Sequence, residues 1–130
     1  MFTRVVTNAG VAGDWTELMS SQSLDWTNLP LKNGASNPDS DDKLQYAVNG
    51  GLVHLRGRVK IPETDGVVFA ILPTGARPRK SWYGGCQVGG TTGDRKIGIR
   101  SNGEVAALGF AVNNLDTVTY TYVNVSFPIG

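Results

Sequence analysis

The sequence is poor in the residues that most often perform chemistry, because it contains a single cysteine and a single histidine. The lone Cys86 excludes a disulfide within the chain and any metal site that needs a pair of cysteines. A nucleophile and base pair would require Cys86 and His54 to converge, yet Cys86 lies among glycines and His54 lies among arginines. We therefore predict no enzymatic activity, no catalytic residue, no cofactor and no metal site.

Two further absences exclude whole classes of partner. The formal net charge is only +1, so the chain lacks the broad cationic surface that neutralises a nucleic-acid backbone. No apolar stretch approaches the length of a membrane span, and the N-terminus lacks a basic start followed by an apolar run. We predict neither nucleic-acid binding nor membrane insertion.

Glycine and proline, by contrast, are well represented. The 17 glycines and 6 prolines separate short runs of strand-forming residues, which is typical of many short strands joined by tight turns. A length of 130 residues suits one domain with its own core. We predict an all-β domain of roughly eight to ten antiparallel strands, as a β-barrel or a β-sandwich, with Greek-key connections.

The stretch 66–78 contains the clearest strand and the most rigid loop. The apolar run 67–72 ends at Pro73, which indicates a buried strand followed by a turn. Proline and glycine in the following residues fix a loop that cannot continue a helix. This loop carries Arg77 and Arg79 and is expected to present them to a ligand.

The clearest hairpin pairs residues 44–48 with residues 52–61 across the turn 49–51. Alternation along the second strand places Val53 and Leu55 toward the core and leaves a polar file that includes His54, Arg56 and Arg58 on the other face. This file could bind an acidic ligand, contact a neighbouring subunit, or simply face water. The pattern leaves these alternatives open.

Aromatic residues next to glycines and small hydroxylated residues characterise the segment 80–94, which we interpret as a loop. Flat aromatic faces stack on the apolar face of a pyranose ring while polar neighbours bond its hydroxyls. Alternatively, Trp82 or Tyr83 packs into the core. The predicted saccharide-binding residues are Trp82, Tyr83, Arg77, Asp94 and His54.

The C-terminal third contains a hairpin of residues 95–100 and 104–112, and then a last strand at 118–127. Alternation directs Val123 and Phe127 toward the core and leaves two tyrosines on the opposite face. Such tyrosines serve as a ligand platform or as a subunit contact. The predicted subunit-interface residues are Tyr120, Tyr122, Arg56 and Arg58.

Five motifs, taken in order, resemble the head domains of bacteriophage tail-fibre and receptor-binding proteins. The run Leu-Pro-Thr-Gly-Ala-Arg-Pro at 72–78 is similar to their Leu-Pro-x-Gly-x-Arg-Pro signature. The other motifs are Trp-Thr-Asn-Leu-Pro-Leu-Lys-Asn-Gly at 26–34, Leu-Gln-Tyr at 44–46 with Val-His-Leu-Arg-Gly at 53–57, Ser-Asn-Gly-Glu-Val at 101–105, and Val-Ser-Phe-Pro-Ile-Gly at 125–130. The resemblance covers residues 26–130, and it depends on motif order more than on any one motif.

This resemblance implies a homotrimer in the phage tail, assembled in the host cytoplasm, that adheres to host cell-surface or cell-wall saccharide without catalysis and contacts other tail or baseplate proteins. The head domain is expected to span 22–130, with 1–21 either ending a preceding fibre module or forming a first strand. Two alternatives stay open: a structural trimerisation tip or virion-decoration module, and, more remotely, a polysaccharide depolymerase. Carboxylates are available for glycoside cleavage, but nothing in the sequence selects two of them.

Overall fold

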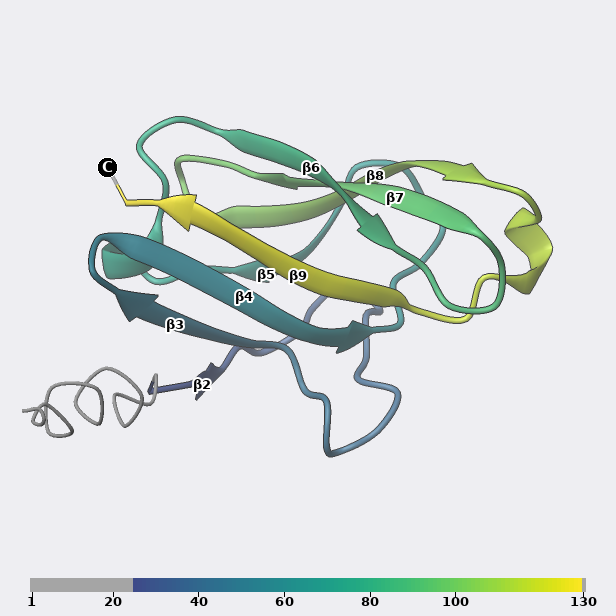
Figure 1. The fold of residues 1–130 in the computed structure, drawn as a ribbon, viewed down its shortest axis with the longest axis horizontal. Helices are drawn as coiled ribbons and strands as arrows, with labels where there is room; N and C mark the ends of the chain where they lie inside the picture. The colour runs from purple at the N-terminus through teal and green to yellow at the C-terminus, as the bar shows by residue number, and fades with distance from the viewer. Residues whose placement is uncertain (1–24, 130) are drawn as a thin grey trace, which may run out of the picture.

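The computed structural model describes residues 25–129, which form two four-stranded β-sheets packed face to face (Figure 1). The first sheet has the order β2-β3-β4-β9, with bounds Thr27–Asn28, Gln45–Asn49, Leu52–Val59 and Thr121–Pro128. The second has the order β5-β8-β7-β6, with bounds Val67–Ile71, Glu104–Val112, Gly93–Ile99 and Trp82–Gln87. Two short 3₁₀ helices, η1 at Thr74–Ala76 and η2 at Leu115–Thr117, lie in the connections. The segment 1–21 lies outside the described residues.

All paired strands are antiparallel, and the two sheets form a sandwich and not a closed barrel. Along the edge where β6 and β9 meet, the sheets are joined by single bridges, Val88 to Thr121 and Pro78 to Ile129. These bridges do not extend into a ladder between the sheets within residues 25–129. Of the two predicted architectures, the structure therefore has the sandwich.

Strand alternation builds the core as the sequence predicts. In β4, Val53, Leu55 and Val59 are fully buried, and the intervening residues face outward. Opposite them in β9, Val123 and Phe127 are 1% exposed. Burying each such side chain stabilises the fold by roughly 1.5–3 kcal/mol relative to its exposure. The core therefore fixes which residues of β4 and β9 reach the outer surface.

The predicted strand at 67–72 lies at one edge of the second sheet. Phe69, Ala70 and Leu72 are fully buried, whereas Ile71 is 42% exposed. A bulge between Val68 and Ala70 lets two consecutive side chains, Phe69 and Ala70, both be buried. The prediction of a buried strand is thus confirmed for Phe69, Ala70 and Leu72, and alternation turns Ile71 to the outer face.

The segment 80–94 contains strand β6, where we predicted a loop, so that prediction is wrong. Glycines disfavour strands by propensity, but here they make room for aromatic rings. A Cβ on Gly84 would lie 2.4 Å from the indole of Trp82, so the indole lies against the Gly84 backbone.

In residues 25–129 no helix is long and apolar enough to cross a membrane.

Candidate functional site

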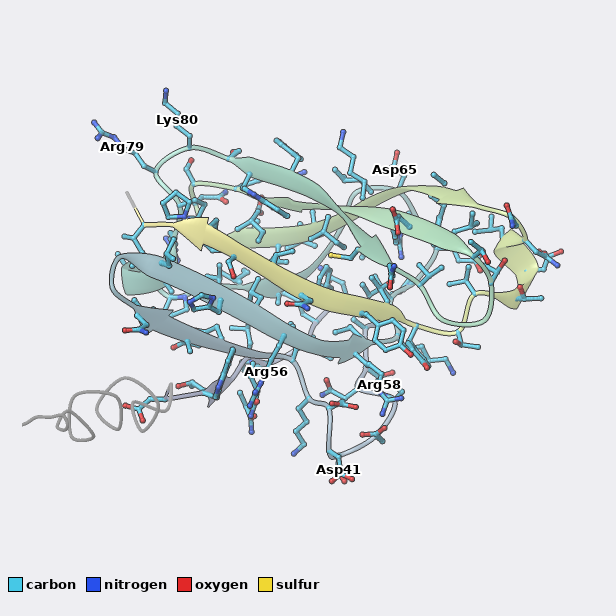
Figure 2. All side chains as sticks on the ribbon, viewed as in Figure 1. Asp41, Arg56, Arg58, Asp65, Arg79 and Lys80 are labelled. Carbon is cyan, nitrogen blue, oxygen red and sulfur yellow. The ribbon has the colours of Figure 1, made fainter. Side chains whose placement is uncertain are left out.

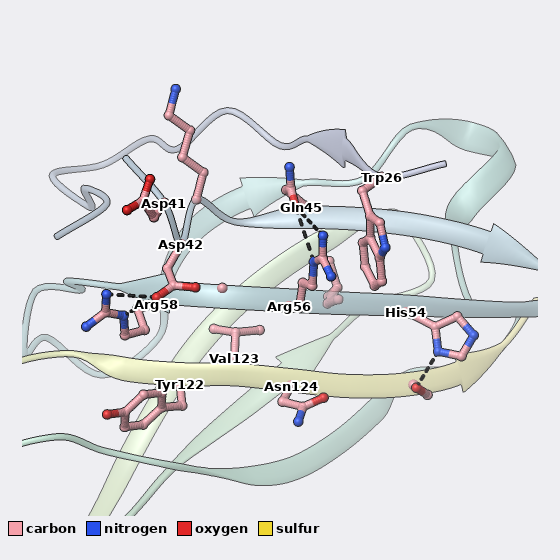
Figure 3. A pocket seen from close by; sticks show the side chains of 14 residues that line it. Trp26, Asp41, Asp42, Gln45, His54, Arg56, Arg58, Tyr122, Val123 and Asn124 are labelled. Carbon is pink, nitrogen blue, oxygen red and sulfur yellow. Dashed lines mark hydrogen bonds and ion pairs between the residues drawn. The ribbon is translucent and has the colours of Figure 1, made fainter. Parts of the chain in front are cut away.

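A groove of about 610 Å³ runs along the outer face of the first sheet (Figure 3). Strands β4 and β9 form its floor, the loop 41–43 forms one wall, and Trp26 stands at the other side. We call it the β4–β9 groove, and its lining residues are Trp26, Asp41, Asp42, Lys43, Gln45, His54, Leu55, Arg56, Gly57, Arg58, Tyr122, Val123, Asn124 and Ser126.

The floor consists of three cross-strand pairs of polar side chains. The register between β4 and β9 pairs His54 with Ser126, Arg56 with Asn124, and Arg58 with Tyr122. Directly opposed residues of an antiparallel pair share one face, so the polar file predicted for β4 meets a second polar file from β9. His54 Nδ1 lies 2.7 Å from Ser126 Oγ, within hydrogen-bond distance.

Arg56 is held flat against the indole of Trp26. Its guanidinium carbon lies 3.8 Å from the centroid of the ring. Both Nε and one Nη of Arg56 donate to Oε1 of Gln45, at 3.2 Å and 3.1 Å. Stacking and two hydrogen bonds therefore fix a cation and an aromatic side chain together at one side of the groove.

Arg58 is fixed at the opposite end by the acidic loop. Its guanidinium donates to Asp42 Oδ2 at 2.8 Å and also to Asp39. Gly57 permits this approach, because its φ is +142° and a Cβ there would lie 2.7 Å from both Leu44 Cα and the Lys43 carbonyl oxygen. The loop backbone passes so close to β4 that only glycine fits at this position.

Two tyrosines lie beside Arg58: Tyr122 lines the groove, and Tyr120 lies next to Tyr122 outside it. The hydroxyls of Tyr120 and Tyr122 are 2.9 Å apart, and the ring centroids are 5.0 Å apart in an edge-to-face arrangement. The hydrogen bond with Tyr122, followed by that with Arg58, lowers the pKa of Tyr120, whereas the same tyrosine pair raises the pKa of Tyr122. The tyrosine pair thus favours ionisation of Tyr120 over ionisation of Tyr122.

The groove offers many hydrogen-bonding groups, and an aromatic side chain lies on either side of it. Carboxylates, amides, hydroxyls and cations alternate over its floor and walls, as suits a ligand covered with hydroxyl groups. Residues 25–129 contain no cluster of three or more histidines, cysteines or carboxylates that could hold a metal. The carboxylates near Arg58 are instead occupied by that arginine.

The five residues that we predicted for saccharide binding do not lie together. His54 lines the β4–β9 groove, where it joins Arg56, Arg58 and Tyr122, which we had assigned to a subunit interface. Figure 2 shows Arg56 and Arg58 on the side of β4, while Arg79 and Lys80 extend from a different corner of the sandwich. The structure therefore brings one part of the predicted saccharide site together with most of the predicted interface.

The adjacent aromatics Trp82 and Tyr83 point to opposite faces of β6, because side chains alternate along a strand. Trp82 is half-buried against the core, as the packing alternative predicted. Tyr83 is 51% exposed on the outer face of the second sheet, where its ring covers Gly98 and Lys96 Nζ lies 5.4 Å from the ring centroid.

The remaining two predicted residues have different surroundings. Asp94 is exposed on β7 and pairs in register with Gln87, on the same sheet as Tyr83. Arg77 is half-buried, and its Nε donates to the Leu72 carbonyl at 2.9 Å, so the guanidinium braces its own loop.

The groove residues absent from the predicted sites include Trp26, Asn124 and Ser126. Asn124 shares its face with Tyr122, so alternation along the last strand could have identified both Asn124 and Ser126 as neighbours of the β4 file. That inference requires the pairing of β4 with β9, which are separated in the chain by all four strands of the second sheet. Trp26 was noted only as the first residue of the motif at 26–34 that resembles phage head domains.

Comparisons with known proteins agree on one fold. Residues 20–127 match the family model described as the YomR C-terminal beta sandwich domain. A curated relative, the SPbeta prophage-derived uncharacterized protein YomR of Bacillus subtilis, is 32% identical over 124 residues, which cover 93% of this chain but 30% of YomR. The chain therefore spans about a third of the length of that relative.

Two solved structures have similar folds. The receptor binding protein gp15 of Listeria phage PSA matches with a TM-score of 0.64 and 17% identity, covering 99% of this chain and 82% of gp15. The head domain of the lactococcal phage bIL170 matches with a TM-score of 0.57 and 19% identity, covering 83% of this chain and all of the head domain. The predicted resemblance to phage head domains is confirmed for the fold, whereas the Leu-Pro-x-Gly-x-Arg-Pro motif stays a prediction.

Proposed function

The chain belongs to the family of the YomR C-terminal beta sandwich domain, and on that premise we propose that it is the receptor-binding head domain of a bacteriophage tail protein. Two of its structural neighbours are a phage receptor binding protein and a phage head domain, and a curated relative is derived from a prophage. These names support a protein of the virion that lies in the phage tail and takes part in attachment to a host cell.

Within this role, the receptor is a host cell-surface or cell-wall saccharide, bound in the β4–β9 groove. The observation that carries this proposal is the row of three polar cross-strand pairs on the groove floor, with the Trp26 indole beside the middle pair. Hydroxyl-rich ligands need donors and acceptors at short intervals, and aromatic side chains provide faces for pyranose rings. Binding is proposed without catalysis, as adhesion.

Three shallow sites on one particle would bind far more tightly than one, which is why a homotrimer is part of the proposal. Three copies held together would keep their grooves within reach of one polymer.

The strand order β5-β8-β7-β6, with β5 next to β8, supports the Greek-key connection predicted from the sequence.

A structural tip is the second candidate, favoured by one cluster. Tyr120, Tyr122 and Arg58 form a connected, partly exposed group that could pack against a neighbouring subunit or another tail protein. In that case the tyrosines contribute to assembly and not to sugar binding.

The test is calorimetric titration of the protein with a panel of purified bacterial wall polysaccharides, with its solution mass measured by light scattering. The proposal predicts a trimer that binds at least one polysaccharide and releases no reducing ends from it. A trimer that binds none would favour the structural tip, and release of reducing ends would favour a depolymerase.

A further inference from the structure

Arg95 is the one charged side chain in the buried core of residues 25–129, where it is 1% exposed. It lies in β7 between the sheets, in line with the fully buried Ile97 and Ile99. Burying a charge without an opposite charge is costly, so arginine at such a position is unusual unless its guanidinium has strong partners.

The partners of Arg95 are all neutral. Nε donates to the Leu108 carbonyl at 3.0 Å, one Nη donates to the Ile61 carbonyl at 3.4 Å, and the other donates to the Thr64 carbonyl at 3.1 Å. The guanidinium carbon lies 4.3 Å from the centroid of the Phe110 ring. A guanidinium has five N–H donors, so two of them lack an acceptor among the described residues.

Arg95 also lines a second cavity, of about 290 Å³, between residues 34–36, residues 60–63 and the start of β9. We call it the Arg95 pocket, and it is lined by Gly34, Ser36, Lys60, Ile61, Pro62, Glu63, Arg95, Val118, Thr119, Tyr120 and Thr121. Its polar side chains are an ammonium group, the guanidinium, four hydroxyls that can donate or accept, and the Glu63 carboxylate. Thr121 is buried as well.

Carboxylates do not neutralise Arg95 directly. Glu63 lines the pocket and Asp65 lies close in the chain, but neither forms an ion pair with Arg95 in the described part of the chain. Burial lowers the pKa of Arg95, and the distant charges of Asp65 and Glu63 raise it. The guanidinium therefore remains a cation whose charge is only partly balanced by the protein.

We propose that the Arg95 pocket binds a small oxyanion, a phosphate or carboxylate group, through the free N–H groups of Arg95, the Lys60 ammonium and the neighbouring hydroxyls. The planar fork of arginine matches such groups with two hydrogen bonds. This site is separate from the β4–β9 groove and goes beyond the proposed function. The two surfaces adjoin at the Tyr120 and Tyr122 pair, since Tyr120 lines the pocket and Tyr122 lines the groove.

The test follows the side-chain Nε–H resonance of Arg95 by NMR while the intact chain is titrated with inorganic phosphate, acetate, or chloride at matched ionic strength. The proposal predicts a saturable shift with phosphate or acetate and none with chloride. The Lys60→Ala variant removes one cation from the Arg95 pocket and is expected to weaken phosphate binding by about tenfold. Lys80→Ala is the matched control, because Lys80 is an exposed cation that lines a different cavity, and it should leave binding unchanged.

Two results would overturn the proposal: an Arg95 resonance that does not move with either oxyanion, and equal weakening by Lys60→Ala and Lys80→Ala, which would indicate unspecific screening. The wild-type resonance reports on the site even if a variant fails to fold. Titrations with glucose 1-phosphate and with glucose show whether the bound oxyanion is attached to a sugar. Tighter binding of glucose 1-phosphate than of phosphate indicates an acidic group on a sugar, and equal binding indicates the free ion.

Discussion

The guanidinium carbon of Arg56 lies 3.8 Å from the centroid of the Trp26 ring, so a residue just before β2 and a residue in the middle of β4 form one side of the groove. Gln45 on the intervening strand bonds the same guanidinium. The contact joins three strands of one sheet at the place where a ligand would lie.

Replacing this indole is expected to affect binding far more than stability. In Trp26→Ala the groove loses an aromatic side, so polysaccharide affinity should fall by up to about tenfold, in line with a lost stacking contact of about 0.5–1.5 kcal/mol. The exposed cation–π contact contributes about 0.5–1 kcal/mol, so the free energy of unfolding should fall by no more than that. Calorimetry and urea unfolding measure the two quantities. A variant that binds normally would remove Trp26 from the site.

Gly57 should tolerate no side chain. A Cβ there meets loop backbone at 2.7 Å and the residue has a φ of +142°, so Gly57→Ala should lower the free energy of unfolding by about 1–3 kcal/mol or more. Gly75→Ala is the matched control, because a Cβ on Gly75 meets nothing within 4 Å. Its stability should change by less than about 1 kcal/mol in either direction. Equal effects in urea unfolding would refute the close approach of the loop.

Cys86 should react with a thiol reagent only when the protein unfolds. Burial, aided by Asp94, raises the pKa of the thiol, while a hydrogen bond from the Asn124 backbone lowers it. The resulting stability is fully present below the pKa of the unfolded thiol and is lost as pH rises through the higher folded-state pKa. Colour development with an aromatic disulfide should therefore be slow in buffer and accelerate with urea. An immediate reaction of the native protein would contradict the buried position.

Tyr120 and Tyr122 should ionise at different pH values, with Tyr120 first. Because the hydrogen bond with Tyr122 is the main cause of the lowered pKa of Tyr120, Tyr122→Phe should raise that pKa toward its ordinary value. The ionised Tyr120 stabilises the fold above the pKa of an unfolded tyrosine, and this contribution is lost as pH falls through the folded-state pKa. Ultraviolet or NMR titration measures the shift, with Tyr46→Phe as the control. An unchanged pKa in Tyr122→Phe would contradict the pairing.

Local patterns in the sequence were sufficient to predict much of the sandwich but little of the site. Alternation in 52–61 correctly separated the buried Val53 and Leu55 from the outward His54 and Arg56, because a period of two is a local property. The strand at Trp82–Gln87 was missed, because its glycines oppose strand propensity and are explained only by the aromatic rings that cover them.

The groove itself depends on which strands become neighbours. His54 meets Ser126 only because β9, the last strand, pairs with β4. Likewise, Trp82 and Tyr83 are both aromatic but lie on opposite faces of β6. The Arg77 side chain donates a hydrogen bond to the Leu72 carbonyl of its own loop. Residue type alone grouped five side chains that the fold distributes over several surfaces.

The most direct test of the saccharide site compares two outer faces of the sandwich. Purified wall polysaccharide that binds the wild-type protein is titrated into Asn124→Ala, from the groove floor, and into Gln87→Ala, an exposed polar residue of β6 outside the groove. Loss of a hydrogen bond to the ligand should weaken Asn124→Ala by about tenfold, and Gln87→Ala should bind like the wild type. Undiminished binding by Asn124→Ala, together with lost binding by Tyr83→Ala, would contradict the account and move the site to the outer face of the second sheet.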